Sequence, residues 1–340
     1  MKISLETHTL TFQKPAKTSR GEYLEKQSHL LRISNETKSV VGEASPLSDL
    51  SLDGKVDFHQ IIDNLSDKEY NFDELLALKE DWNHYPALRF ALDCALKKWI
   101  SNHENPNLWV HNEFTNGKIG IHINGLVWMN QIEAMEQEAF EKVQTGFSCI
   151  KFKVGALDFD AECRLLERFR RKFSAFQVEI RLDANGAFAP DEALIQLREL
   201  KRFDIHSIEQ PIKPNQWDAL AEICAKSPID IALDEELIGQ SVNNAGKMLK
   251  SIHPKYIILK PTLLGGFDIA DQWITAAEKQ EIGWWSTSAL EGNIGLADIA
   301  QWASTHELIR PQGLGTGSLF IQNFSAQTRI VGQQLFYIPS

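Results

Sequence analysis

The sequence predicts an α/β protein: a (β/α)8-type barrel, whose last helix can be replaced by other structure, with an α+β capping domain. From about residue 117 onwards, short apolar runs alternate with amphipathic helical segments, the pattern of parallel strands joined by helical crossovers. Eight such runs occur over about 200 residues, which suits a closed barrel. The rival, an open doubly wound sheet, is disfavoured because no G-x-G-x-x-G follows the first run.

The composition limits the classes of partner. A length of 340 residues suits one large domain plus a smaller one. The net charge of −11 argues against a nucleic-acid partner, because phosphate binding needs a basic surface, but it leaves an anionic small molecule open. No stretch of about 18 apolar residues occurs, and no apolar run follows a basic cluster at the start, so we expect neither a membrane partner nor a signal peptide. The four cysteines form no C-x-x-C pair and are expected to be free thiols, with a cytoplasmic location as the default.

Residues 1–105 are expected to form the capping domain. Residues 8–12 and 30–33 alternate apolar and polar side chains, which predicts strands with a loop at 17–21 between them. A second loop is predicted at 42–47. Farther along, apolar residues at i, i+3, i+4, i+7, i+8 and i+11 predict a helix with one buried stripe: Leu88, Ala91, Leu92, Ala95, Leu96 and Trp99.

Residues 115–317 are expected to form the barrel. The polar stretch 102–107 is the predicted junction with the capping domain, and residues 318–340, which are again strand-like, are expected to return to that domain. Helices are predicted between the strands, for example at 161–173, 191–201 and 266–280. The predicted strands are 120–123, 149–154, 178–182, 205–208, 229–233, 256–259, 283–286 and 308–311.

Three acidic residues, Asp183, Glu209 and Asp234, each follow an apolar run. They are 26 and 25 positions apart, and Lys260 follows 26 positions later, which is one β/α unit each time. Any one acid at a strand end is usually a solvated charge, but barrel strands end at one mouth, where three carboxylates repel one another unless a cation joins them. Oxygen ligands without His or Cys favour Mg²⁺, with Mn²⁺ as a possible substitute.

Two lysines on one predicted strand, Lys151 and Lys153, lie two positions apart and therefore face the same side. That side is expected to be the barrel interior, because Ile150 and Phe152 face the helices. A Lys-x-Lys pair is common on surface strands, but here neighbouring cations are expected to lower the pKa of Lys153 towards that of a usable base. Lys260 is expected to approach from the opposite side of the mouth.

At these strand ends the sequence resembles that of the enolase superfamily, and the resemblance extends along nearly the whole chain. The residues at the strand ends are Lys151-Phe152-Lys153, Asp183-Ala184-Asn185, Glu209-Gln210-Pro211, Asp234-Glu235 and Lys260-Pro261. With a lysine at the end of the sixth predicted strand, the chain resembles the muconate-lactonising subgroup. The resemblance implies removal of a proton next to a carboxylate by a lysine, with magnesium stabilising the ene-diolate intermediate. Asn185 and Glu235, directly after ligands, are expected to orient them or to be ordinary loop residues.

Three further segments resemble the o-succinylbenzoate synthase family: 42–47, 286–291 and 313–317. This resemblance implies a carbon–oxygen lyase that dehydrates 2-succinyl-6-hydroxy-2,4-cyclohexadiene-1-carboxylate for menaquinone biosynthesis. Lys153 would take the proton next to the carboxylate and then protonate the departing hydroxyl group, and Lys151 and Lys260 would stabilise the negative charge. The small-molecule carboxylate is the expected partner. The substrate contacts that we expect are Arg181, Arg20, Ser286, Thr287 and Ser288.

Two alternatives stay open. An N-acylamino acid racemase or dipeptide epimerase of the same superfamily would use the same lysine pair. The stretch 313–317 lacks the acids that dipeptide epimerases use to hold the substrate ammonium, which counts against a dipeptide substrate. The absence counts less against an N-acylated substrate, because an acylated nitrogen needs no counter-ion. A non-catalytic binding barrel is disfavoured because the five lysines and acids that the chemistry needs are all present. The sequence leaves the oligomeric state open.

Overall fold

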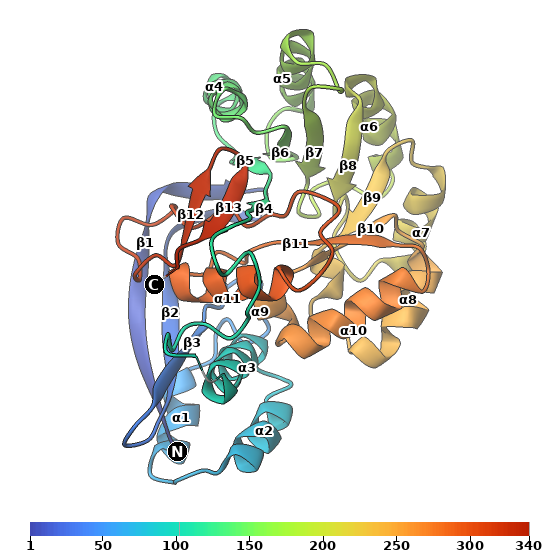
Figure 1. Cartoon of the computed structure of the whole chain (residues 1–340). Coiled ribbons are helices and arrows are strands. Elements are labelled where there is room, and N and C mark those ends of the chain that lie inside the picture. Colours follow the sequence, from blue (N-terminus) through green and yellow to red (C-terminus); the bar gives the residue numbers. More distant parts are fainter. Residues whose placement is uncertain (102, 340) are drawn as a thin grey trace.

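The computed structural model describes residues 1–101 and 103–339, and it has a capping part and a barrel (Figure 1). The chain opens with a three-stranded antiparallel sheet in the order β1-β2-β3. The loop predicted at 17–21 is the tight turn between β1 and β2. The loop predicted at 42–47 instead starts inside β3, where Gly42 lets the strand approach Ala91 so closely that a Cβ atom would meet its carbonyl. The strands are β1 (Lys2–Thr18), β2 (Gly21–Ser34) and β3 (Ser39–Ala44).

Three helices complete the capping part, and the third is the one predicted from its apolar stripe. Its Leu88, Ala91, Leu92 and Ala95 are fully buried against the sheet, which confirms the predicted face. The buried carboxylate of Asp53 accepts hydrogen bonds from two backbone N–H groups at the start of this helix, where free donors are expected. The helices are α1 (Phe58–Ser66), α2 (Phe72–Asp81) and α3 (Pro86–Ile100).

The barrel consists of a seven-stranded parallel sheet in the order β11-β10-β9-β8-β7-β6-β5, wrapped by helices. Consecutive strands are neighbours, as helical crossovers require. Six of the predicted runs coincide with strands: β6 (Cys149–Lys153), β7 (Glu179–Asp183), β8 (Ile205–Glu209), β9 (Asp230–Leu233), β10 (Tyr256–Leu259) and β11 (Gly283–Ser286). The helices before, between and after these six strands are α4 (Ile132–Gln144), α5 (Phe159–Lys172), α6 (Ala193–Leu200), α7 (Trp217–Lys226), α8 (Ala245–Ile252), α9 (Pro261–Leu264), α10 (Phe267–Glu278) and α11 (Asn293–Ala303).

The first predicted barrel strand needs correction. Within the run 120–123, β4 (Ile121–His122) pairs antiparallel with a C-terminal strand, and the first strand of the barrel is β5 (Gly125–Val127). Only Ile123 and Asn124 separate the two strands, which is too short a break for the sequence to show where one sheet ends and the other begins.

The eighth predicted strand, 308–311, also needs correction. It is not a strand. The barrel is closed one step later by Gln312 and Gly313, which form isolated bridges to Ile123 and Thr287. Pro311 has no N–H to donate to a ladder, and Ile309 is 78% exposed, so the apolar run 308–311 could not serve as a central strand.

The C-terminal residues lie against both parts of the molecule. Residues 319–321 run beside β1, with hydrogen bonds from Gln13 N to Leu319 O and from Ile321 N to Thr11 O, each 2.8 Å long. The hairpin of β12 (Thr328–Val331) and β13 (Gln334–Tyr337) then pairs with β4. It stands where an eighth barrel helix would follow, and the described chain has no such helix. The domain limits remain predictions, and residues 102 and 340, which fall within predicted segments, lie outside the described residues.

None of the helices in the described part of the chain is both long enough and apolar enough to cross a lipid bilayer.

A buried ion pair joins the capping part to the barrel. Lys98 of α3 contacts Asp298 of α11 at 2.6 Å, and both side chains are fully buried. Lys98→Met would leave the Asp298 carboxylate buried and uncompensated, so we expect it to lower the free energy of unfolding by about 3–5 kcal/mol. Urea titration would measure this loss. The double variant Lys98→Met/Asp298→Asn should recover a large part of it, and a single variant as stable as the wild type would contradict the expectation.

Candidate active site

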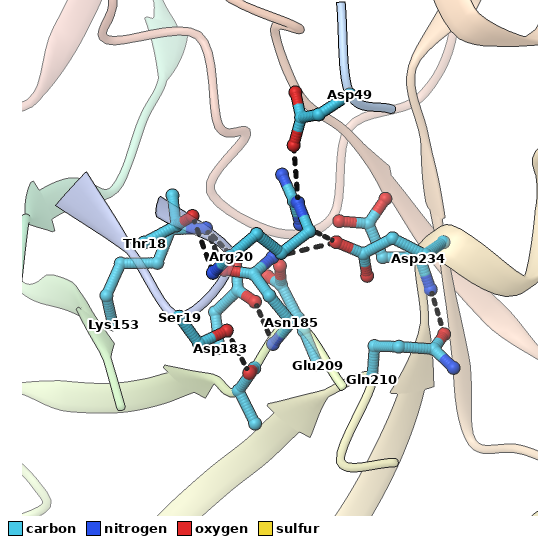
Figure 2. A network of polar contacts seen from close by, with 12 residues as sticks. Thr18, Ser19, Arg20, Asp49, Lys153, Asp183, Asn185, Glu209, Gln210 and Asp234 are labelled. Atoms are coloured by element: carbon cyan, nitrogen blue, oxygen red, sulfur yellow. Dashed lines mark hydrogen bonds and ion pairs between the residues drawn. The ribbon is translucent and has the colours of Figure 1, made fainter. Parts of the chain in front are cut away.

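Three carboxylates lie together at the C-terminal ends of adjacent strands (Figure 2). Asp183 and Glu209 are the last residues of β7 and β8 and stand opposite each other in the register, and Asp234 directly follows β9. One oxygen atom from each lies within 4.8 Å of the others, and all three side chains are buried. Parallel strands with a repeating crossover length bring residues that are one repeat apart to the same edge. The acidic cluster predicted from spacing is therefore present in the fold.

The cluster suits a divalent cation. Glu209 Oε1 is buried and has no hydrogen-bond partner among the described residues. Burial raises the pKa of Glu209 to about 8, and Asp183 and Asp234 act in the same direction against the opposing charge of Lys151. The free oxygen could coordinate a bound cation, whose charge would offset the repulsion between the three carboxylates. Because all the donors are carboxylate oxygens, the set fits a hard ion such as magnesium.

Three lysines surround the acids. Lys151 Nζ lies 2.9 Å from Glu209 and 3.3 Å from Asp183. Lys153 Nζ donates to Asp183 at 2.6 Å, and Lys260 Nζ lies 2.5 Å from Asp234. Between the two lysines of β6, Phe152 faces the hydrophobic core, as the strand alternation predicted. β6 and β10 are separated by three strands in the sheet order, so Lys153 and Lys260 approach the acids from different sides.

The lysines differ in the direction of their pKa shifts. Burial lowers the pKa of Lys153, and the charges of Lys151 and Lys260 lower it further, although Asp183 opposes them. For Lys260, burial also acts to lower the pKa, but Asp234, Glu235 and Asp183 outweigh it and the net pKa is raised. Lys153 is therefore better suited than Lys260 to act as a neutral amine base.

A chain of hydrogen bonds links the capping part to Lys153. Arg20, in the turn between β1 and β2, contacts Glu235 at 2.5 Å and Asp49 at 3.3 Å. The Asn185 amide donates to Glu235 at 2.9 Å, and its oxygen accepts from Lys153 at 2.9 Å. Figure 2 shows Arg20 lying above the strand ends, between Asp49 and Asn185. The Asn185 backbone N–H also donates to Asp183 at 3.1 Å, so Asn185 contacts both a predicted ligand and Lys153. Glu235, the other residue expected to orient the ligands, instead contacts Arg20 and Asn185.

Some of the predicted substrate contacts line the cavity above these groups. Arg20, Thr287 and Ser288 form part of its wall. The sequence pattern did not single out the apolar side chains of the wall, although Leu47 and Leu290 belong to two of the segments that resemble the o-succinylbenzoate synthase family. These side chains come from both parts of the molecule: Leu47, Leu50, Leu126, Trp128 and Leu290.

Two predicted contacts do not line the cavity and need correction. Ser286 is fully buried and donates to Gln312, because it points outward from β11. Arg181 shares the inward face with Asp183 but lies one layer deeper. Its guanidinium contacts Glu179 at 2.7 Å and the carbonyl of Pro311 at 2.9 Å, and no part of it is exposed. The alternation along β7 thus predicted the correct face for Arg181 but not how deep in the barrel the side chain lies.

Comparison with known proteins shows the family to which the chain belongs. The family model described as "Enolase C-terminal domain-like" matches residues 134–327. The chain is 40% identical to o-succinylbenzoate synthase of Desulfotalea psychrophila, over 98% of both sequences. The crystal structure of MenC from Desulfotalea psychrophila superimposes with a TM-score of 0.89 at 38% identity, covering 99% of each chain.

More distant structures share the fold. The L-Ala-D/L-Glu epimerase from Bacillus subtilis has a TM-score of 0.86 at 19% identity, covering 99% of this chain and 96% of that one. The family model covers more than half of the chain, and the Desulfotalea relative extends along nearly its full length. The chain therefore belongs to the enolase superfamily.

Proposed function

We propose that this chain is an o-succinylbenzoate synthase. It removes water from 2-succinyl-6-hydroxy-2,4-cyclohexadiene-1-carboxylate to give 2-succinylbenzoate in menaquinone biosynthesis. The observation that carries the proposal is the placement of Lys153 and Lys260 on different sides of a buried carboxylate cluster, in a chain 40% identical to such an enzyme over its full length. The family fixes the class of chemistry, and the full-length relative supports the substrate.

In this proposal Asp183, Glu209 and Asp234 hold Mg²⁺, with Mn²⁺ as a possible substitute. When bound, the metal supplies the positive charge that holds the substrate carboxylate and stabilises the negative charge that develops on it. Lys151, which contacts Glu209 and Asp183, adds a fixed positive charge at the same place. The substrate is a small-molecule carboxylate.

Lys153 performs both proton transfers. Its neutral amine takes the proton from the ring carbon that carries the carboxylate, so the C–H bond breaks and the electron pair stays on the substrate. Lys153 then gives this proton to the departing hydroxyl group as the C–O bond breaks, and water and an aromatic ring result. Lys260 stabilises the negative charge during the reaction from its own side of the cavity, in part through a cation–π contact with the ring.

The capping part closes the cavity over these groups. Arg20, Thr287 and Ser288 are proposed to contact the succinyl arm, and the apolar wall excludes water from the reacting atoms. Exclusion of water strengthens the interactions between the lysines and the developing charge, because the local dielectric is lower.

A racemase or epimerase is the second candidate. The same lysines on two sides of one carboxylate cluster would allow one to remove a proton and the other to return it. The Bacillus subtilis structure named above shares the fold but is 19% identical, so it supports this alternative less than the Desulfotalea relative supports the dehydratase.

The test is an absorbance assay with the cyclohexadiene substrate. We expect magnesium-dependent loss of the diene absorbance, with a turnover on the order of 1–1000 per second. A chelator should abolish it, and added magnesium should restore it. Racemisation of an N-acylamino acid with deuterium uptake from heavy water, without any dehydration, would replace this proposal by the second candidate.

A further inference from the structure

A lysine of the capping sheet is buried without being part of the catalytic cluster. Lys26 lies on β2, and its ammonium group donates hydrogen bonds to three backbone carbonyls: Ser45 at 2.9 Å, Leu290 at 3.0 Å and Ala289 at 3.3 Å. An ammonium group has three N–H donors, so all of them are used. Ser45 belongs to the capping part and the other two to the loop after β11 of the barrel. One side chain thus fixes backbone from both parts.

The surroundings of Lys26 indicate that its role is to hold backbone rather than to form an ion pair. Within the described residues, the hydrogen bonds of Lys26 go to backbone carbonyls and none goes to a carboxylate, although Glu43 and Glu291 are buried nearby. Glu43 accepts hydrogen bonds from Ser28 and from the N–H groups of two glycines at the start of α11. Glu291 accepts from Thr262 and Ser288. The two acids are therefore engaged elsewhere.

The backbone that Lys26 holds forms one wall of the active-site cavity. Ala289 and Leu290 line the cavity, and so does Leu47, two residues after Ser45. Leu290 has a φ of +64°, a conformation that is costly for a residue with a branched side chain and persists only where the surroundings enforce it. Leu47 and Leu290 also belong to one apolar cluster. The placement of this apolar wall thus depends on the ammonium group beneath it.

We propose that Lys26 is a positioning residue that sets the apolar wall formed by Leu47, Ala289 and Leu290, and thereby determines how tightly substrate binds. The inference rests on the proposed function, because it assigns this wall to substrate binding. Lys26 contacts none of the acids and lysines assigned to the chemistry. Its loss should therefore act on KM much more than on kcat.

The ionisation of Lys26 offers a second way to examine its role. Burial lowers the pKa of Lys26 to about 8, although Glu291 and Glu43 act in the opposite direction. His29 lies on the same strand, and its pKa is lowered first by burial and then by the charges of His59 and Lys26. As the pH rises through about 8, the ammonium group loses one of its three donors, so one carbonyl of the wall loses its partner. Substrate binding should weaken accordingly.

The first experiment compares Lys26→Met with the double variant Lys98→Met/Asp298→Asn, which also removes a buried lysine between the two parts but lies away from the cavity lining. We expect Lys26→Met to raise KM by about tenfold, with kcat within about threefold of the wild type, as loss of hydrogen bonds from a charged group implies. The double variant should keep the wild-type KM. An unchanged KM in Lys26→Met, or an equal rise in both variants, would overturn the inference.

The second experiment does not depend on the folding of Lys26→Met. KM of the wild type and of Lys26→Arg is measured from pH 7 to pH 9. Arginine stays charged over this range, so its KM should change several times less than that of the wild type above pH 8. A flat wild-type profile, or the same rise in both proteins, would contradict the role of Lys26. If the wild type itself does not turn over the cyclohexadiene substrate, the proposed function fails instead.

Discussion

Lys153→Ala is expected to lower turnover by at least about a hundredfold, since a general base contributes about 10²–10⁴ in rate. Within the described part of the chain, the hydrogen bonds of the Lys153 ammonium group go to Asp183 and Asn185, so its removal should leave the metal cluster in place. Product affinity, measured by calorimetry, should stay within about tenfold of that of the wild type, because the wall and the metal ligands are unchanged. Stopped-flow absorbance would give the rate.

The control for this variant is Lys255→Ala. Lys255 is exposed and lies just before β10, at the end of the barrel opposite the acids. Turnover of this control should equal that of the wild type. If Lys153→Ala keeps turnover within about tenfold of the wild type, where a lost base implies much more, the assignment of the base is wrong.

The pH dependence adds a separate check on the same residue. A base acts in its neutral form, so kcat/KM should rise with pH as Lys153 loses its proton. Burial and the neighbouring lysines lower the pKa of Lys153, so this rise should come below the ordinary value of 10.5. The residual activity of Lys153→Ala should lack the rise.

Glu209→Gln is expected to weaken magnesium binding by at least about a hundredfold. Loss of a group that only orients a metal ligand typically costs 10–100-fold, and Glu209 is placed as a ligand itself. The substitution keeps the size of the side chain but replaces a charged oxygen by an amide, which magnesium binds more weakly. Calorimetric titration of the metal-free protein would measure the affinity, and turnover at low magnesium should fall with it.

Glu236→Gln provides a matched control. Glu236 is also a buried carboxylate near the end of β9, but it accepts hydrogen bonds from Asn215 N at 2.9 Å and Trp217 Nε1 at 2.8 Å. The Glu236→Gln substitution should leave the affinity for magnesium unchanged even if the protein is less stable. Equal magnesium affinity in Glu209→Gln and the wild type would exclude Glu209 as a ligand.

The strand ends were the part of the site that could be predicted best. β10 and β11 have the predicted bounds, and Asp183, Glu209 and Asp234 meet as their spacing indicated. Strand alternation and a constant repeat length are local properties of the chain. In a parallel barrel they are sufficient to determine which side chains face inward at the same height.

The predictions failed where neighbouring segments compete or where depth matters. Residues 120–127 could supply either of two sheets, and pairing with β13, more than 200 positions away, assigns β4 to the outer one. Arg181 has the predicted face but lies beneath the acids, because two positions along a strand of about 3.3 Å per residue place it one layer deeper. Periodicity alone shows the face of a strand and not its height in the barrel.

The sequence by itself determined the fold class, the acidic cluster, the lysines and, through the resemblance, the chemistry. Only the tertiary structure decided how the capping part completes the site: Arg20 meets Glu235 across 215 positions, and Lys26 meets Leu290 across 264. Such contacts depend on how the two parts pack together, and side-chain periodicity within either part is the same whatever the packing. The active site's floor is therefore determined by local pattern, and its walls by long-range contacts.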